Sequence, residues 1–134
     1  MSKAVVYWTQ TGNTEAMAKI IADAAGAEMI TSDAFDAAKA AEFDAIALGC
    51  PAMGNEELED SEFQPMWDGV KAALAGKKVA LFGSYGWGDG EWMRNWEDDA
   101  KAAGITLVCD SVTCCEAPDG DAEEALKKLA AALA

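Results

Sequence analysis

The chain of 134 residues contains no histidine, and this absence excludes a whole class of sites. Imidazole is a common acid–base group near neutral pH and a common metal ligand, so neither kind of chemistry can depend on it here. The four cysteines, at positions 50, 109, 114 and 115, show no Cys-x-x-Cys spacing and signal neither a zinc site nor a redox dithiol. We therefore expect no metal. Free thiols without a signal peptide predict a cytoplasmic protein.

Basic residues are also scarce, because 10 Lys and Arg stand against 24 Asp and Glu, for a formal net charge of -14. Such a surface repels nucleic acid and anionic membranes, so we expect neither as a partner. It suits basic partner proteins, whose approach an opposite field accelerates, although solubility alone also explains an acidic surface. No apolar run approaches the ~20 residues of a membrane span.

Short apolar runs alternate with longer stretches of helical periodicity, which predicts an α/β fold. We expect strands at residues 4–8, 29–31, 43–49, 79–85 and 105–112. We expect helices at residues 13–25, 34–41, 63–74 and 91–103, and a last one that Asp121 caps and that runs to Ala134. The length predicts one domain, residues 1–134, with a parallel sheet covered on both faces. In such sheets ligands bind beyond the carboxyl ends of the strands, so the loops after strands one, three and four should converge.

The first of these loops, Thr9-Gln10-Thr11-Gly12-Asn13-Thr14, predicts a phosphate site. It opens a helix, whose first N–H groups and dipole favour an anion, and its Thr hydroxyls add donors. The loop contains no Lys or Arg, which is more typical of a caged cofactor phosphate than of an incoming nucleotide. The alternative is an ordinary helix cap made by Asn13 or Thr14.

The two other loops predict a flat slot for an aromatic ring. Met53, in the loop after the third strand, is polarisable and able to lie against a ring, and Glu56 can accept from a ring N–H. Trp87 stands between glycines in residues 83–90, which is typical of a displayed stacking platform. The alternatives are an ordinary turn and a chance surface Trp. The glycine loop matches neither a dinucleotide fingerprint nor a Walker A motif.

In combination these segments resemble the flavodoxins, and especially their short-chain clostridial and Megasphaera-like kind. The matching segments are residues 6–8, 11–18, 48–54, 56–60 and 76–89. The resemblance implies a three-layer sandwich around a five-stranded parallel sheet in the order 2-1-3-4-5. It also implies a low-potential electron carrier, not an enzyme. Such a carrier moves one electron at a time on non-covalently bound FMN, through its semiquinone/hydroquinone couple, beside ferredoxin or in its place.

The resemblance also implies which residues contact FMN. Those expected at the phosphate are Thr9, Gln10, Thr11, Gly12, Asn13 and Thr14, and those along the ribityl chain are Pro51, Ala52 and Ser84. Those expected at the ring are Met53, Glu56, Tyr85, Gly86, Trp87, Gly88, Asp89 and Gly90, with Met53 and Trp87 flanking it and Glu56 bound to N3–H. The peptide between Gly54 and Asn55 is expected to flip on one-electron reduction. Asn55 and Pro51 depart from common family residues, and no role is carried over to Glu116 or Ala117.

Two other functions stay open on the sequence: an FMN-dependent NAD(P)H quinone or azo reductase, and a signalling or binding domain of this fold without flavin. No Lys/Arg cluster marks a nicotinamide site, and the first strand ends in Trp8-Thr9 rather than in a phosphorylatable Asp. The partners implied are oxidoreductases with basic patches, docking at an acidic rim around the flavin. That rim is expected to comprise Glu56, Glu57, Glu59, Asp60, Asp89 and Glu91. We expect a monomer.

Overall fold

A computed structural model describes residues 2–53, 56–86, 88 and 90–134 and confirms the α/β fold. The elements in chain order are β1 (Lys3–Tyr7), α1 (Asn13–Ala25), β2 (Glu28–Thr31), the 3-10 turn η1 (Ser32–Ala34), α2 (Ala37–Ala40), β3 (Ala45–Gly49), α3 (Phe63–Val70), η2 (Lys71–Leu74), β4 (Lys78–Tyr85), α4 (Glu91–Ala102), β5 (Val112–Cys115) and α5 (Gly120–Ala132). The strands form a parallel five-stranded sheet in the order β2-β1-β3-β4-β5, as the resemblance implied.

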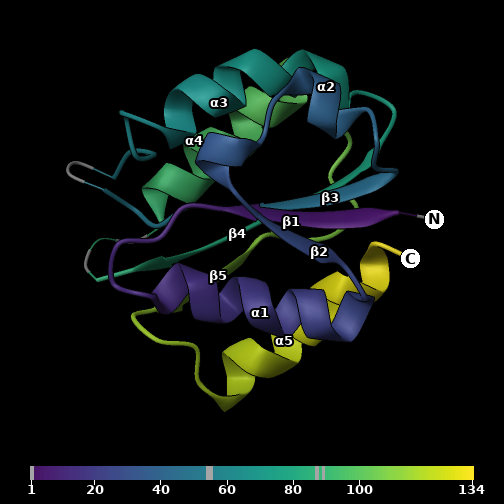
Figure 1. Ribbon diagram of the computed structural model, residues 1–134. Coiled ribbons are helices and arrows are strands. Elements are labelled where there is room, and N and C mark those ends of the chain that lie inside the picture. Colours follow the sequence, from purple (N-terminus) through teal and green to yellow (C-terminus); the bar gives the residue numbers. More distant parts are fainter. Residues whose placement is uncertain (1, 54–55, 87, 89) are drawn as a thin grey trace.

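The sheet is the middle of three layers, with α1 and α5 on one face and α2, α3 and α4 on the other (Figure 1). Successive strand residues point to opposite faces, so Val5 packs with the α1/α5 layer and Val6 with the α3/α4 layer. Helices on both faces bury both sets of side chains. This explains why β1, β3 and β4 are nearly continuous apolar runs.

Helix α1 begins and ends where its pattern predicts. Met17 and Ile21, one turn apart, are fully buried against the sheet. The small side chains of Ala45, Ala47 and Ala80 share that cluster, which leaves room for the helix to approach closely. Gly26 ends the helix at a φ of 68°, in the left-handed region that favours glycine.

The prediction for the fifth strand was wrong. Before Val112, the apolar run at residues 105–112 makes a single isolated bridge to β4, between Leu107 and Val79. Regular pairing begins at Val112 and runs to Cys115, beside the second half of β4. The earlier part of the run is an extended approach, and Ile105 is buried in the core without belonging to the strand. The carboxyl end of β5 therefore lies at Cys115, three residues later than expected.

Four helix predictions need smaller corrections. Within residues 34–41 only Ala37–Ala40 form an α-helix, α2, which follows the 3-10 turn η1, and residues 63–74 divide into α3 and η2. Asp119, and not Asp121, caps α5, because its carboxylate accepts from the N–H of Ala122 at 2.9 Å. Helix α4 ends one residue earlier than predicted.

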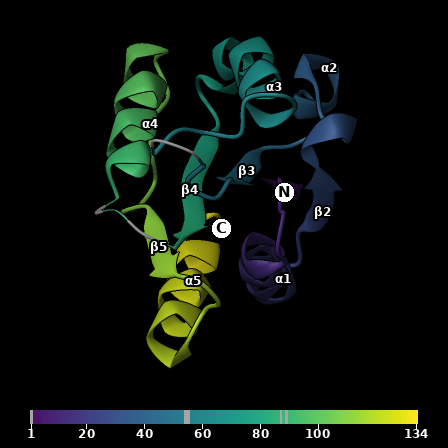
Figure 2. The ribbon, with the colours of Figure 1, turned by 90° about the vertical axis from the view of Figure 1, so that its left-hand side faces the viewer.

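The carboxyl ends of the strands lie at the left in Figure 1, opposite both chain termini. Figure 2 turns this edge toward the viewer, so that the loops after β1, β3 and β4 face the reader. Among the described residues, no helix combines the length and the apolar character needed to cross a bilayer.

Candidate cofactor site

A cavity of about 220 Å³ lies beyond the carboxyl ends of β1, β3 and β4. Its lining comes from all three loops and from the end of β5: Thr9, Gln10, Thr11, Asn13, Thr14, Pro51, Ala52, Met53, Ser84, Tyr85, Gly86 and Glu116. The structure thus brings together 11 of the residues that the resemblance assigned to the cofactor. Gly12, Glu56, Gly88 and Gly90 are described but do not line this cavity. Gly54, Asn55, Trp87 and Asp89 lie outside the described residues.

The N-terminus of α1 faces this cavity without a side-chain cap. Gly12 is the N-cap residue, at a φ of 96°, and none of the described side chains accepts a capping hydrogen bond there. Neither Asn13 nor Thr14 caps the helix, so the alternative reading of this loop is wrong. The hydroxyl of Thr14 is buried and shares a 3.1 Å hydrogen bond with Ser84 Oγ. The first N–H groups of α1 therefore keep their capacity to bind an anion.

Backbone hydrogen bonds carry the sheet pattern past the strand ends and into the loops. The N–H of Trp8 donates to Gly49 O at 3.1 Å, and that of Ala52 donates to Ser84 O at 3.0 Å. Two further bonds, of 2.8 and 2.9 Å, join the backbones of Met53 and Glu57 in both directions. The loop after β3 is thus tied to β4 at its start and closed on itself around residues 53–57.

A close backbone approach supports the floor of the site. A Cβ added to Gly83 would lie 2.2 Å from the carbonyl oxygen of Cys50, so only glycine fits there. The same oxygen accepts from Trp92 Nε1 at 3.1 Å. Burial, with a smaller contribution from the Glu59 carboxylate, raises the pKa of the Cys50 thiol far above its ordinary value. The thiol is therefore inert.

Glu56 connects two of the three loops. Its Oε1 accepts from the N–H groups of Gly90 at 3.1 Å and Glu91 at 3.0 Å, at the start of α4. Gly88 lies beside the Glu56 carboxyl at a φ of 89°, in the left-handed region that favours glycine. Glu56 has a φ of 56°, an unusual conformation for a side-chain-bearing residue. The carboxylate therefore holds the loop before α4 against the loop after β3.

The acidic rim requires one correction, because Glu59 is not part of the surface. Glu59 is only 5% exposed, and its carboxylate accepts from the N–H groups of Glu62 and Phe63 at 2.7 and 2.8 Å. Burial acts to raise the pKa of Glu59, but these bonds and those from Ser61 outweigh it and hold the pKa below its ordinary value. Glu59 is a buried cap for α3.

Glu116 lines the cavity, although the resemblance assigned no role to this residue. It follows β5 directly, with a φ of 61°, and its N–H donates to Tyr85 O at 2.7 Å. Its position directly after a strand could have indicated a site residue. The prediction missed this because it ended the fifth strand three residues too early. Cys114, two residues earlier in β5, is buried, which raises its pKa to about 11, while Cys115 is exposed. All four cysteines are free.

The lining combines polar residues that suit the phosphate of FMN with apolar residues that suit its ring. Thr9, Thr11 and the first residues of α1 are all part of the lining, and together they offer the hydroxyl and N–H donors that a phosphate needs. Ala52 and Met53 supply apolar surface from another loop, as a ring requires. Within the described ranges, no group of three or more Cys, Asp or Glu is arranged to hold a metal ion.

Comparison with known proteins identifies one family. A family profile described as Flavodoxin matches residues 5–128. The flavodoxin of Megasphaera elsdenii is 47% identical over 124 residues, which cover 89% of this chain and 90% of that protein. The flavodoxin of Clostridium beijerinckii is 46% identical over 109 residues, which cover 78% and 79%.

Solved structures give the same result. The solution structure of the two-electron reduced Megasphaera elsdenii flavodoxin superposes with a TM-score of 0.90 at 43% identity, covering 98% of this chain and 97% of that one. A flavodoxin from the domain Archaea superposes with a TM-score of 0.84 at 26% identity, covering 99% and 96%. The two alternatives, a reductase and a flavin-free domain, are not favoured by these relatives. The chain belongs to the flavodoxin family, and it is an electron-transfer protein that carries FMN rather than an enzyme.

Proposed function

We propose that residues 1–134 act as a single domain that carries one electron at a time at low potential, beside ferredoxin or in its place. The observation that carries the proposal is the uncapped N-terminus of α1, which opens on a hollow lined by hydroxyls and by Met53. An FMN phosphate would accept hydrogen bonds from the free N–H groups of the helix, so that the loop could bind it without a Lys or Arg side chain.

Each loop then has a separate task in holding FMN. The donors for the phosphate are Thr9, Gln10, Thr11, Gly12, Asn13 and Thr14, and the ribityl contacts are Pro51, Ala52 and Ser84. The ring contacts are Met53, Glu56, Tyr85, Gly86, Gly88 and Gly90, together with Gly54, Asn55, Trp87 and Asp89 outside the described residues. The bound flavin supplies the redox chemistry.

The chain itself sets the electrostatic environment of the carrier. Glu116 lines the cavity, and Glu56 and Glu57 lie in the loop after β3. Negative charge close to a redox group opposes the addition of an electron, and solvent screens this effect only partly at a protein surface. These carboxylates support a low potential.

The same acidity supports the proposed partners, which are oxidoreductases with basic patches that dock near the cofactor. Free thiols at Cys50 and Cys114 support a cytoplasmic location, since disulfides are rare there. We propose a monomer, which size-exclusion chromatography tests directly.

The experiment that tests the function compares FMN with riboflavin, which lacks the phosphate. The purified chain is stripped of flavin and titrated with each compound, while flavin fluorescence is followed. We expect FMN to bind tighter by roughly tenfold or more, because several charge-assisted hydrogen bonds reach the phosphate. Equal affinity for both compounds would contradict the phosphate site, and failure to bind either would overturn the function.

A further inference from the structure

Four aromatic side chains lead from the cofactor cavity into the layer formed by α3 and α4. Tyr85 lines the cavity, and its ring centroid lies 5.8 Å from that of Trp92, in α4. Trp92 and Trp96 are four residues apart on α4, so they are neighbours on one face of the helix. The Trp96 ring meets that of Trp67, in α3, at 89°, with centroids 5.7 Å apart. We call Tyr85, Trp92, Trp96 and Trp67 the aromatic path, and its three indoles are at most 2% exposed.

The indole N–H groups along the aromatic path have different partners. Trp92 Nε1 donates to the carbonyl oxygen of Cys50 at 3.1 Å, and a carbonyl is not a base. Trp96 Nε1 is buried and has no hydrogen-bond partner among the described residues. Trp67 Nε1 donates to the carboxylate of Asp99 at 2.7 Å. Of the three indoles, Trp67 is therefore the one with a base placed to take its N–H proton.

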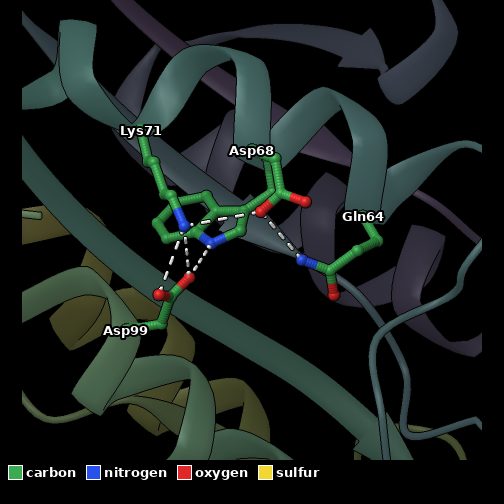
Figure 3. A network of polar contacts seen from close by, with 5 residues as sticks. Gln64, Asp68, Lys71 and Asp99 are labelled. Carbon is green, nitrogen blue, oxygen red and sulfur yellow. Dashed lines mark hydrogen bonds and ion pairs between the residues drawn. The ribbon is translucent and has the colours of Figure 1, made fainter. Parts of the chain in front are cut away.

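Asp99 connects the far end of the aromatic path to solvent. Its side chain is 42% exposed, and Lys71 Nζ lies 3.1 Å from its carboxylate, in the network that Figure 3 shows. The hydrogen bond from Trp67, followed by that from Lys71, holds the Asp99 pKa below its ordinary value despite partial burial. Asp99 is therefore an ionised proton acceptor at neutral pH.

The charge beside the aromatic path favours a cation. Trp92 and Trp96 line a cavity of about 430 Å³ between α3 and α4. The lining of this cavity holds one ammonium group, that of Lys71, and five carboxylates, which belong to Glu56, Glu57, Asp60, Asp68 and Asp99. An indole that has lost an electron is a cation, and excess negative charge close to a poorly solvated site stabilises it.

We propose that the aromatic path gives the protein a light-driven activity, the transfer of one electron from Trp67 to bound FMN. Flavins carry single electrons, and a light-excited flavin is a strong enough oxidant to take one from an indole. Trp92 gives an electron to the excited flavin across Tyr85, Trp96 then reduces Trp92, and Trp67 reduces Trp96. This inference rests on the proposed function, because it requires FMN in the cavity that Tyr85 lines.

The proton of Trp67 decides how long the charge separation lasts. Oxidised Trp67 is an N–H acid and gives its proton to Asp99, which leaves a neutral Trp67 radical, a protonated Asp99 and one added electron on the flavin. The electron cannot return until this proton has returned. A thiolate in solution can then reduce Trp67: the thiolate loses one electron and becomes a thiyl radical, and Asp99 returns the proton to Nε1. The net reaction is a one-electron reduction of the flavin by the thiolate, driven by light.

The first test is transient absorption spectroscopy of the FMN-loaded protein after a pulse of blue light. We expect a neutral tryptophan radical that outlives the excited flavin. Trp96→Phe should abolish this signal by interrupting the path, and it costs no hydrogen bond because Trp96 Nε1 has no partner among the described residues. Trp8→Phe is the matched control and should keep the signal, since Trp8 donates to Glu62 outside the path. Equal signals in the two variants, or none in the unaltered protein, would overturn the path.

The second test separates the base from its charge. Asp99→Asn and Asp68→Asn each remove one carboxylate beside Lys71, at 3.1 and 3.4 Å, but Asp99 is the one bonded to Trp67. We expect Asp99→Asn to shorten the life of the radical and to leave it as the cation, which absorbs at longer wavelength than the neutral radical. Asp68→Asn should keep the long-lived neutral form. Equal lifetimes would overturn the proton transfer to Asp99.

The two proposals fail in different ways. FMN affinity, read from the flavin spectrum, reports the proposed function and should be the same in Trp96→Phe and Trp8→Phe. Any electron given by Trp87, which we propose at the flavin ring, is common to both variants. A protein that binds FMN but forms no long-lived tryptophan radical overturns the light-driven activity alone, and a protein that binds no FMN overturns both proposals.

Discussion

The buried carboxylate of Glu59 offers a demanding test of how the loop after β3 is held. Its Oε1 accepts from the N–H groups of Glu62 and Phe63, and its Oε2 accepts from the N–H of Ser61 at 2.8 Å and from the Ser61 hydroxyl. No other side chain caps this end of α3 among the described residues. The N–H of Glu59 donates to Cys50 Sγ at 3.3 Å, which links the cap to the floor of the cofactor site.

We expect Glu59→Gln to lower the free energy of unfolding by about 2–4 kcal/mol at neutral pH. The amide has nearly the same shape, but one oxygen is replaced by a donor that faces other donors. Two bonds to a charged group are then lost, at ~1.5–3 kcal/mol each before relaxation. Glu28→Gln is the matched control, because Glu28 is exposed on β2, and such surface changes usually stay within about 0.5 kcal/mol.

The difference between the two proteins should depend on pH in a defined direction. The folded-state pKa of Glu59 lies below the ordinary value of 4.5, so its stabilisation is present above that value and disappears as pH falls toward the folded pKa. Urea unfolding, followed by Trp fluorescence, should therefore show a large effect of Glu59→Gln at pH 7 and a smaller one near pH 4. An effect no larger than that of Glu28→Gln, or one that does not change with pH, would refute the reasoning.

Three further outcomes follow from the geometry. Gly83→Ala should lower the free energy of unfolding by about 1–3 kcal/mol in urea titrations, because its Cβ meets Cys50 O, and native stability would contradict this. Thr14→Val should weaken FMN binding in fluorescence titrations roughly fivefold to tenfold, since it removes the hydroxyl bonded to Ser84, and an unchanged affinity would count against the phosphate loop. Asp99→Asn should lower the melting temperature at pH 7, and this difference should shrink as the pH falls below the ordinary aspartate pKa of 3.8. The hydrogen bond from Trp67 and, after it, that from Lys71 hold the Asp99 pKa below its ordinary value despite partial burial. A melting-temperature difference that stays the same at every pH would exclude a stabilising role for the Asp99 charge.

The elements that sequence predicts well here are those whose pattern is local. Helix α1 repeats buried residues one turn apart and ends at a glycine, and both features are visible without knowledge of the fold. The prediction of the fifth strand fails because the pairing of this strand is decided by β4, which is distant in the sequence. Residues 105–112 are as apolar as a strand, yet only Val112 and those after it lie beside β4 in register.

The same distinction applies to the site. The anion character of the first loop comes from neighbouring residues, so it can be predicted from the sequence. The bond between Thr14 and Ser84 joins residues 70 apart, and that of Glu56 with Gly90 joins residues 34 apart, so neither could be predicted. Glu116 was missed for a related reason, because its place depends on where β5 ends.

The backbone bonds that continue the sheet into the loops have a consequence for the speed of electron transfer. Trp8, Ala52 and Glu116 each donate to the neighbouring strand or its end, so the cradle is an extension of the rigid sheet. A redox group in a stiff, preorganised cradle displaces few atoms when its charge changes. Reorganisation at these three anchored positions is then small, which leaves the flip expected of the peptide between Gly54 and Asn55 as the main rearrangement of the cradle on reduction.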